Sequence, residues 1–456
     1  MKRMLSSWRD VSSRSVPIAR KRFHAGLVRL GRMLVNLLKT CLAFYLAALL
    51  LSCASLTLSQ EAPLAYRAKT LYTGAGEPIA DGIVLIRNGL ITAVGPAAQV
   101  DLPKGTRVRQ AEVITPGFID PHSHVGLFRY LLSGYGEMAG EGSGPFSPEF
   151  RVSEVFDATD PEIAEAVQGG VTAVAIRPGS AKVIAGQSAL IKMRPGREAS
   201  ELIARSPLDL KFALEWNPLL VYGGRRVSPR TRMKMYSMVR EKLREAQDYR
   251  WRRQIRRLAG PASGLDDEPL FDPGLAALER LLAGDFPAHV HTSRADEIIE
   301  AMRLADEFGF RIVLAHAEWG FLVADEIAKR NVICVVGPRL FRPDPRTGEL
   351  VNIAAALSEA GVKVAFQTDH PVCKQQHLRY NAALAVRYGM DPELALAGIT
   401  RVAAESIDAL DRIGTLEVGK DADLVLLDGP PLEMTSRVLA TVIEGETVYD
   451  AEQETR

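Results

Sequence analysis

Apolar segments alternate with helical stretches over the middle of the chain, and this alternation predicts the fold. The strand-like segments are residues 113–119, 170–176, 210–215, 287–291, 311–316, 332–336 and 362–367, with one more expected inside 188–193. Strands that are apolar on both faces need helices on both sides, which is typical of parallel sheets. The sequence therefore predicts the α/β class, with a (β/α)8 TIM barrel over residues 114–412; a doubly wound sheet is the alternative.

The two ends of the chain carry a different pattern, in which short strands are joined by tight turns. The expected strands are residues 65–71, 83–87, 90–94, 424–427 and 440–443. Asn88-Gly89 and Glu444-Gly445 stand at the turn positions that hairpins favour. We therefore expect a small β-sandwich domain formed from both termini, over residues 63–113 and 413–456.

Residues 219–270 interrupt the alternation with a helical, basic insertion. Its central part, residues 223–257, holds thirteen basic residues against Glu241, Glu245 and Asp248. A long solvated helix outside the barrel is the ordinary interpretation of such a stretch. The alternative is a positively charged cap over the site that helps to select acidic substrates.

Charge is distributed unevenly along the chain. Hydrophobic residues make up 47% and charged residues 24% of the sequence, which are ordinary values for a globular protein. Residues 1–40 hold ten of the 56 Lys and Arg and one of the 55 acids, so the remainder has 46 basic against 54 acidic residues. A mildly acidic body argues against a nucleic-acid partner, which needs an excess of basic residues.

Residues 1–60 are expected to be a basic leader with a signal peptide. Residues 41–51 form a dense apolar run, shorter than the roughly 20 residues that a membrane span needs. Leu50-Leu51-Ser52-Cys53 resembles a lipoprotein cleavage site, with Cys53 as the lipidated residue. We expect an exported, periplasmic protein with possible membrane attachment through its N-terminus; an uncleaved anchor, and a start at Met33, are the alternatives.

Cysteine is scarce in the body of the chain. Only Cys334 and Cys373 lie beyond the leader. Both fall near expected strand ends, so a bridge between them is conceivable, but buried free thiols are the preferred interpretation.

Histidines follow the expected strands with a regular spacing. His122 and His124 are two apart after the first strand, so both rings can point the same way. His291 and His316 lie one strand–helix unit apart, and Asp369 follows two units later. Because the carboxyl ends of barrel strands open onto one face, these five side chains are expected to converge there. Imidazole and carboxylate groups in one place predict a site for a divalent metal.

The chain resembles the amidohydrolase superfamily, in the branch around imidazolonepropionase and related amidohydrolases and dipeptidases. The motifs that carry the resemblance are VITPGFIDPHSHVGL (113–127), GGVTAVAIRPGSAKVIAGQSALIK (169–192), PAHVHTSRADEI (287–298), RIVLAHAEWGF (311–321), FQTDHPV (366–372) and DRIGTLEVGKDADLVLLDG (411–429). The resemblance extends from about Ala65 to Asp450. It implies a metal-bearing barrel beside a small β domain.

The resemblance also assigns metal ligands. His122 and His124 correspond to the first-strand ligands, His291 to the fifth, His316 to the sixth and Asp369 to the eighth. It implies one or two ions, with Zn²⁺ preferred.

A second ion needs a bridging carboxylate, which either Glu215 or a carbamylated Lys211 could supply. Glu215 is slightly favoured because it lies nearer the carboxyl end of the strand. Relatives commonly have Gly-Glu-Asn-Pro where this chain has Glu215-Trp216-Asn217-Pro218, and often a histidine where it has Ser293. His289, one alternation before His291, is expected to play a supporting role.

These residues predict hydrolysis of a carbon–nitrogen bond by activated water. Asp369 is expected to take the proton of the attacking water and return it to the leaving nitrogen, while His291 helps to stabilise the oxyanion. Candidate substrate contacts are Arg177, Tyr222, Arg225 and Arg294. The substrate is expected to be a small amide, a cyclic amide or a dipeptide; deamination of a ring fits less well, and a non-catalytic scaffold is the rival interpretation. We also expect a homo-oligomer.

Overall fold

The computed structural model describes residues 63–128, 139–259 and 270–454. Residues Ala62–Arg456 form one compact unit by themselves. The leader, with its expected signal and lipidation at Cys53, lies outside the described residues, as does part of the insertion, so those expectations stay predictions. Among the described helices, none combines the length and the apolar character that crossing a bilayer requires.

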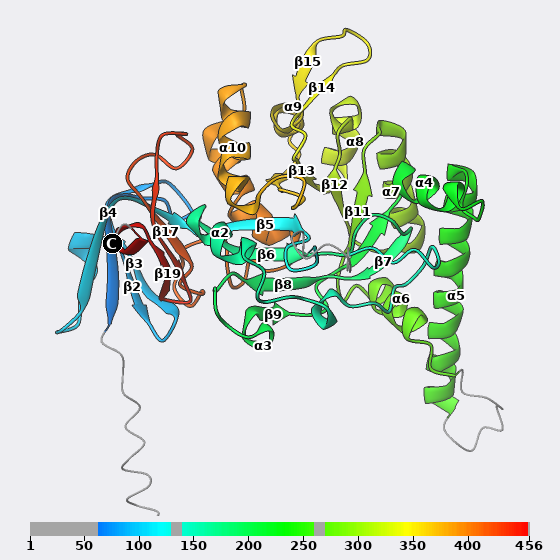
Figure 1. The fold of residues 1–456 in the computed structure, drawn as a ribbon, viewed down its shortest axis with the longest axis horizontal. Helices are drawn as coiled ribbons and strands as arrows, with labels where there is room; N and C mark the ends of the chain where they lie inside the picture. Colours follow the sequence, from blue (N-terminus) through cyan, green and yellow to red (C-terminus); the bar gives the residue numbers. More distant parts are fainter. Residues whose placement is uncertain (1–62, 129–138, 260–269, 455–456) are drawn as a thin grey trace, which may run out of the picture. The chain divides into compact units, whose positions relative to one another are not determined.

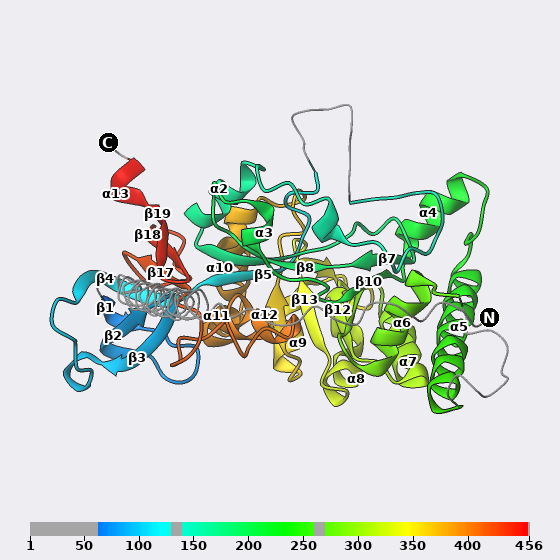
Figure 2. The same cartoon turned by 90° about the horizontal axis from the view of Figure 1, so that it is seen from below.

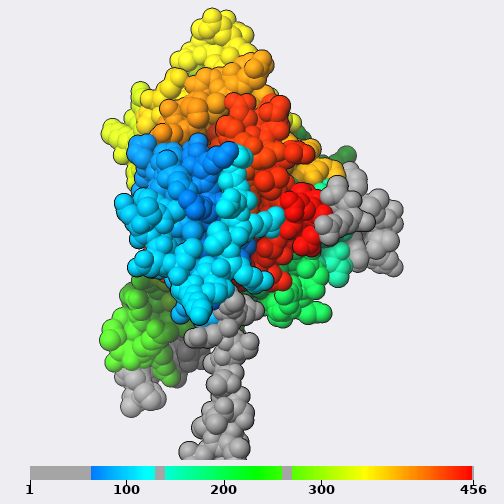
Figure 3. All heavy atoms as spheres, turned by 90° about the vertical axis from the view of Figure 1, so that its left-hand side faces the viewer, coloured from blue at the N-terminus to red at the C-terminus, as the bar shows by residue number. Residues whose placement is uncertain are grey.

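Strands from both ends of the chain form a single seven-stranded sheet (Figure 1). Its strands, in spatial order, are β19 (Glu446–Asp450), β18 (Val438–Ile443), β17 (Leu424–Leu427), β4 (Arg107–Pro116), β1 (Leu64–Leu71), β2 (Ile79–Arg87) and β3 (Leu90–Pro96). The two ends join where β4 pairs with β17 in antiparallel register, with Ile114 opposite Leu426. In the space-filling view, blue and red segments accordingly lie side by side (Figure 3). The sheet from both termini agrees with the expected strands, whereas a second layer that would make it a sandwich stays a prediction.

The middle of the chain forms two further sheets. One has the order β16 (Val364–Phe366), β13 (Ile333–Val336), β12 (Ile312–His316), β11 (Ala288–Thr292), β10 (Leu210–Ala213) and β7 (Ile184–Gln187). The other has the order β5 (Phe118–Ser123), β6 (Val171–Ile176), β8 (Ala189–Lys192) and β9 (Ile203–Arg205). From β10 to β16 every neighbouring pair is parallel, as is the pair β5–β6. The α/β class is therefore confirmed, while closure of all eight strands into one ring stays a prediction.

One expected strand runs in the opposite direction. β8 occupies the predicted segment but pairs antiparallel with β6. Parallel neighbours need a crossover of a dozen or more residues, usually a helix. Between β6 and β8 the chain forms strand β7 and no helix, so β8 returns beside β6 in the antiparallel sense. A predicted strand also ends early, because β10 stops at Ala213 and Glu215 directly precedes a helix.

Helices cover the parallel strands (Figure 2). They are α2 (Glu162–Gln168), α3 (Ala199–Leu202), α4 (Trp216–Gly224), α5 (Arg232–Ala259), α6 (Pro273–Ala283), α7 (Ala295–Phe308), α8 (Ala324–Lys329), α9 (Ile353–Glu359), α10 (Leu378–Arg387), α11 (Pro392–Gly398), α12 (Arg401–Ser406) and α13 (Ala451–Glu454). Shorter elements are the 3-10 turns η1 (Ala97–Gln99), η2 (Val152–Glu154), η3 (Gly320–Val323) and η4 (Gln375–His377), and the hairpin β14 (Phe341–Pro343) and β15 (Leu350–Asn352).

Helix α7 illustrates why these segments are helical. Ile298, Ala301, Met302 and Ala305 recur at spacings of three and four residues and are buried against the sheet. Gly309 ends the helix with a φ of 73°, a left-handed conformation that glycine adopts without steric cost. The long helix expected in the basic insertion is confirmed as α5. It contacts α6 and, through Arg240, the α7 residues Glu300 and Glu307.

A buried charge cluster joins the terminal sheet to the strands of the middle. Lys192, the last residue of β8, lies 2.8 Å from Asp421 and 2.6 Å from Asp423, which precede β17. All three side chains are almost completely buried. The two cysteines in the described part of the chain, Cys334 and Cys373, are free thiols as expected; Cys334 is buried in β13, whereas Cys373 is only half-buried.

Replacing Lys192 should destabilise the protein, because Lys192→Met leaves the buried Asp423 without a cation and leaves Asp421 with Arg412 alone. We expect a loss of about 3–5 kcal/mol in the free energy of unfolding. Urea unfolding measures it, with Lys69→Met as the matched control, since the pair of Lys69 with Glu112 is exposed. The control should lose less than about 1 kcal/mol. Equal losses in the two variants would contradict a stabilising role for the buried cluster.

Candidate metal centre and active site

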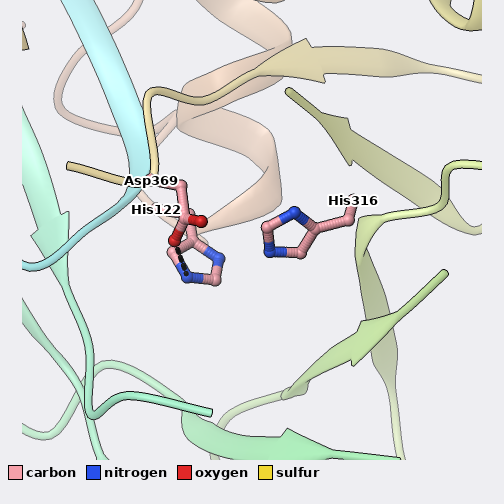
Figure 4. A group of neighbouring side chains, drawn as sticks. All are labelled: His122, His316 and Asp369. Atoms are coloured by element: carbon pink, nitrogen blue, oxygen red, sulfur yellow. Dashed lines mark ion pairs between the residues drawn. The ribbon is translucent and has the colours of Figure 1, made fainter. Parts of the chain in front are cut away.

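Residues from four separate strands converge at one end of the parallel strands. His122 lies in β5 and His124 follows it, His291 lies in β11, His316 ends β12, and Asp369 follows β16. One ligand atom each from His122, His316 and Asp369 lies within 4.8 Å of the others (Figure 4). The structure therefore brings together the residues that the spacing of the sequence predicts to meet.

The side chains of this cluster are in close contact. Oδ1 of Asp369 lies 3.5 Å from Nε2 of His122 and 3.3 Å from Nε2 of His124. The rings of His291 and His316 stack with their centroids 3.8 Å apart. Four imidazoles and one carboxylate are thus crowded into a largely buried space.

The backbone is strained at two of the candidate ligands. His316 has a φ of 68° and Asp369 a φ of 51°, and neither is a glycine. Left-handed conformations of such residues cost on the order of 1–3 kcal/mol and persist only where surrounding contacts enforce them. Here the amide of Asp369 donates to the carbonyl of His122 at 3.1 Å, and that of Ala317 to the carbonyl of Thr292 at 2.9 Å. These bonds between neighbouring strands hold the two ligands over the strand ends.

Protein groups occupy one ring nitrogen of three of the histidines. Nδ1 of His124 lies 2.7 Å from the carbonyl oxygen of Arg177, and Nδ1 of His291 lies 2.6 Å from Oγ of Ser180. Nδ1 of His122 lies 2.9 Å from Nε2 of His289, which fits the supporting role expected for His289. Such bonds fix the ring orientation and leave Nε2 directed at the centre.

His124 and Asp369 together test whether a cation fits. A carbonyl oxygen only accepts hydrogen bonds, so Nδ1 of His124 carries the proton and, in the neutral ring, Nε2 presents a lone pair. That lone pair faces a carboxylate oxygen of Asp369 at 3.3 Å. Two acceptors at this distance repel each other unless a cation lies between them. The donor set of imidazole nitrogens and a carboxylate oxygen suits a divalent ion such as zinc.

Burial sets the charge states of the cluster. Burial, more than the neighbouring charges, lowers the pKa of His122 and of His291 well below 6.5. Burial also lowers the pKa of His316 to about 3. Burial alone would raise the pKa of Asp369, but the adjacent imidazoles of His124, His316 and His291 bring it below its usual value. Neutral imidazoles and an ionised carboxylate are the forms that bind a metal.

Lys211 and Glu215 both reach the cluster, from different sides. Nζ of Lys211 lies 3.3 Å from Nε2 of His122, and burial lowers its pKa to about 7. Oε1 of Glu215 lies 3.1 Å from Nε2 of His291, and burial raises the pKa of this carboxyl group. Oε2 of Glu215 accepts a hydrogen bond from Ser293 at 3.0 Å. The two positions at which this chain departs from its relatives, Glu215 and Ser293, are therefore in contact, and Ser293 orients Glu215.

The predicted substrate contact at Arg177 is wrong. Its guanidinium is completely buried, pairs with Asp209 and donates to the carbonyl oxygen of Pro121. A buried cation needs a buried anion, and Asp209 lies 32 positions further along the chain, where no local pattern announces it. Arg177 instead fixes the chain directly before His122, and its backbone carbonyl holds His124.

Of the other three predicted substrate contacts, Tyr222 lies in α4, Arg225 directly follows that helix, and Arg294 directly precedes α7. The hydroxyl of Tyr222 donates to the carbonyl of Gly144 at 2.5 Å, and Arg225 donates to the carbonyl of Gly142. Arg294 is largely exposed and donates to Asp296 at 2.9 Å. Their contact with a substrate stays a prediction. The contacts of α5 with α6 and α7 support a helix that packs on the outer helices rather than a cap over the site.

Sequence analysis missed a charged group beside His316. Glu318 is buried and pairs with Arg342 and, at 3.4 Å, with Arg339. The guanidinium of Arg342 also lies over the ring of Trp319, at 4.7 Å from its centroid. The available signal was their position, because both arginines closely follow the end of β13. The side chain of Arg339 is exposed, so its guanidinium can also bind a second anion.

Asp120 is a second missed residue. Its carboxylate accepts hydrogen bonds from the amide of His122 at 3.0 Å and from the amide of Thr368 at 3.1 Å. Burial raises the pKa of Asp120 to about 6. The side chain thus ties the two segments that carry His122 and Asp369. Of the remaining histidines, His370 is buried near Glu162 and His377 is exposed at the start of α10.

Comparisons with known proteins identify the family. A model of the amidohydrolase family matches residues 288–448. The solved structure of an amidohydrolase from Thermotoga maritima is 32% identical, covers 85% of this chain and all of its own, and superposes with a TM-score of 0.77. The chain belongs to the amidohydrolase superfamily.

Two curated relatives show how far the similarity extends. Amidohydrolase tasK of Hapsidospora irregularis is 29% identical over 394 residues, which are 81% of this chain but only 40% of that protein. Imidazolonepropionase of Rhizobium rhizogenes is 25% identical over 79% of this chain and 90% of its own length. Molinate hydrolase, at 19% identity and a TM-score of 0.51, shares the fold.

Removing the hydroxyl of Ser180 should weaken metal binding, because the ring of His291 loses the bond that orients it. We expect Ser180→Ala to lower the affinity for zinc by about 10–100-fold. Competition with a chromophoric chelator measures this, and Ser180→Thr should restore the affinity. Ser153→Ala is the control, since Ser153 bonds to Ser206 on the surface. Equal affinity in Ser180→Ala and the control would rule out the orienting role.

Proposed function

We propose that this protein is a metal-dependent amidohydrolase that hydrolyses the carbon–nitrogen bond of a small amide or cyclic amide. The observation that carries the proposal is the lone pair of His124 facing the carboxylate of Asp369 at 3.3 Å, beside three further imidazoles. This arrangement is stable with a cation between the two groups. Membership of the amidohydrolase superfamily supports the same reaction class.

The ligands would be His122, His124, His291, His316 and Asp369, with Zn²⁺ as the preferred ion. A divalent ion in such a site lowers the pKa of bound water to about 7 and polarises the carbonyl of a substrate. Asp369 is ionised and only partly buried, so its carboxylate can accept the proton of the attacking water. It then delivers this proton to the leaving nitrogen. The ring of His291, oriented by Ser180 through Nδ1, would help to stabilise the oxyanion only in a state in which its Nε2 carries a proton instead of holding the ion.

A bridging ligand for a second ion must reach both halves of the cluster. Lys211 contacts His122, and its charge also acts on His291 and His316. Its lowered pKa leaves a neutral amine available near pH 7, the form that combines with carbon dioxide to give a carbamate. These contacts favour a carbamylated Lys211 as the bridge. Glu215, which contacts the His291 side, is the alternative.

A metallodipeptidase is the second candidate. The exposed guanidinium of Arg339, held by Glu318 two residues beyond His316, could bind the carboxylate of a dipeptide. The hydrogen bond from Ser293 to Glu215 argues against a non-catalytic scaffold, because it keeps a carboxyl group at the centre of the cluster although the sequence motif is altered. Metal analysis followed by a library of N-acyl amino acids, cyclic amides and dipeptides separates these candidates. Less than one metal per chain and no turnover would favour the scaffold.

The remaining proposals concern the cellular setting. The leader of residues 1–60 supports export to the periplasm, with membrane attachment at Cys53, and a homo-oligomer is the expected assembly. Signal-peptide cleavage mapped by N-terminal sequencing of the secreted protein tests the first of these.

Replacing Asp369 by asparagine should abolish turnover while the metal remains, because the imidazoles still bind it but no carboxylate accepts the proton. We expect a fall of at least about 100-fold in kcat on the amide found in the library. Metal content by mass spectrometry checks that the ion stays. Asp285→Asn, at a surface pair with Arg280, is the control. Unchanged turnover in Asp369→Asn would remove Asp369 from this role.

Lys211→Met and Glu215→Gln should have different effects on metal content, because the carbamate proposal gives only Lys211 a bridging role. Lys211→Met should lose one of two bound ions, and wild-type protein reloaded with zinc in buffer free of carbon dioxide should take up one ion less. Glu215→Gln should keep both ions. The reverse pattern, with the loss in Glu215→Gln, would assign the bridge to Glu215.

A further inference from the structure

Helix α5 carries two apolar stripes. The inner stripe is Met235, Val239, Leu243, Ala246 and Tyr249, all of them buried. The outer stripe is Trp251, Ile255 and Leu258, which are 61%, 37% and 85% exposed. Packing in the protein interior explains the inner stripe. It does not explain the outer stripe, whose three large apolar side chains lie at helical spacing and remain in contact with water.

The outer stripe points away from the body of the protein. At 3.6 residues per turn, positions 251, 255 and 258 share one face, roughly 150° around the helix from the inner stripe. The exposed fractions agree with this geometry, and α6 and α7 flank α5 on one side only (Figures 1 and 2). Trp251, Ile255 and Leu258 therefore form a free apolar ridge, which we call the outer ridge.

Two further exposed apolar residues, Leu270 and Phe271, lie near the C-terminal end of α5. Arg250 donates to the carbonyl of Leu282, and Arg253 pairs with Glu279, so α5 and α6 run in opposite directions here. The start of α6 is therefore beside the end of α5. Leu270 and Phe271, which directly precede α6, are 93% and 74% exposed.

Positive charge surrounds the outer ridge. Residues 250–258 contain five arginines and no acidic residue, although the chain beyond residue 40 has an excess of acids. Arg252 and Arg257 are exposed and have no acidic partner among the described residues. At 3.6 residues per turn, Arg252 lies about 90° from the middle of the ridge on one side, and Arg257 lies about 130° from it on the other side, nearer to the face of the inner stripe. An apolar strip with tryptophan, bordered by arginines, is typical of helices that lie in the interface of a bilayer.

We propose that the C-terminal end of α5 binds the surface of a bilayer that contains anionic lipid. Trp251, Ile255 and Leu258 would enter the boundary between headgroups and acyl chains, and Arg252 and Arg257 would bind lipid phosphates. Nucleic acid would satisfy the arginines but leave the aliphatic side chains in water. A second copy of this face would bring the two sets of arginines together. The proposal depends neither on the leader nor on the proposed reaction.

The test uses the full chain and a probe confined to the outer ridge, because the leader could bind vesicles by itself. The chain has four tryptophans, so the emission of Trp251 is obtained as the difference between the wild-type protein and Trp251→Phe. Vesicles of phosphatidylglycerol and phosphatidylcholine are compared with vesicles of phosphatidylcholine alone. We expect the difference emission to shift to shorter wavelength only with phosphatidylglycerol present, and to return when about 0.5 M salt screens the charges.

A double variant measures the contribution of the aliphatic side chains. Ile255→Ser/Leu258→Ser should reduce the vesicle partition coefficient at least about tenfold, because less apolar surface is buried. Val418→Ser/Met434→Ser is the matched control, since both residues are exposed outside α5. Thermal unfolding checks that each variant is folded, and size-exclusion chromatography without lipid reports its oligomeric state.

Three results would overturn the proposal. The first is a Trp251 emission that does not change with anionic vesicles. The second is equal vesicle binding by the double variant and the control. The third is a change of oligomeric state in the double variant without lipid, which would assign the ridge to contact between copies of the chain.

Discussion

The repulsion between buried lone pairs is the constraint on which the rest of the structure depends. Nitrogen atoms of His122 and His124 face one oxygen of Asp369, and a backbone hydrogen bond from Asp369 to His122 joins the two segments. Parallel strands make this crowding possible, because their carboxyl ends lie at one edge and each delivers a side chain. The strain at His316 and Asp369 is the structural cost of that convergence, and bonds between the strand ends sustain it.

Groups outside the cluster determine how its members are oriented. The carbonyl of Arg177 fixes the proton of His124, and the guanidinium of the same residue holds the chain before His122. Asp120 ties the first strand to the segment after the last. Residues outside the cluster therefore control the geometry of the candidate ligands, as hydrogen-bonding partners commonly do in metal sites.

Features that depend on the periodicity of the sequence could be predicted, whereas features that depend on a partner far away in the chain could not. His291, His316 and Asp369 could be found because strand spacing repeats along the chain, and the strands of both termini because their turns have distinctive residues. Arg177 was misassigned because its burial depends on Asp209, which no local pattern links to it. The direction of β8 was missed because strand β7, rather than a helix, lies between it and β6. Glu318 and Arg339 escaped notice because their pairing exists only between two loops.

Pairing of β4 with β17 also has a consequence for biosynthesis. β4 leads directly into β5, the strand that holds His122, yet its partner is among the last segments that a ribosome makes. Until β17 emerges, β4 presents an unpaired edge, the kind of surface that promotes aggregation. A truncated transcript that ends before residue 424 would thus yield a polypeptide that contains every candidate metal ligand but has an open, adhesive sheet margin.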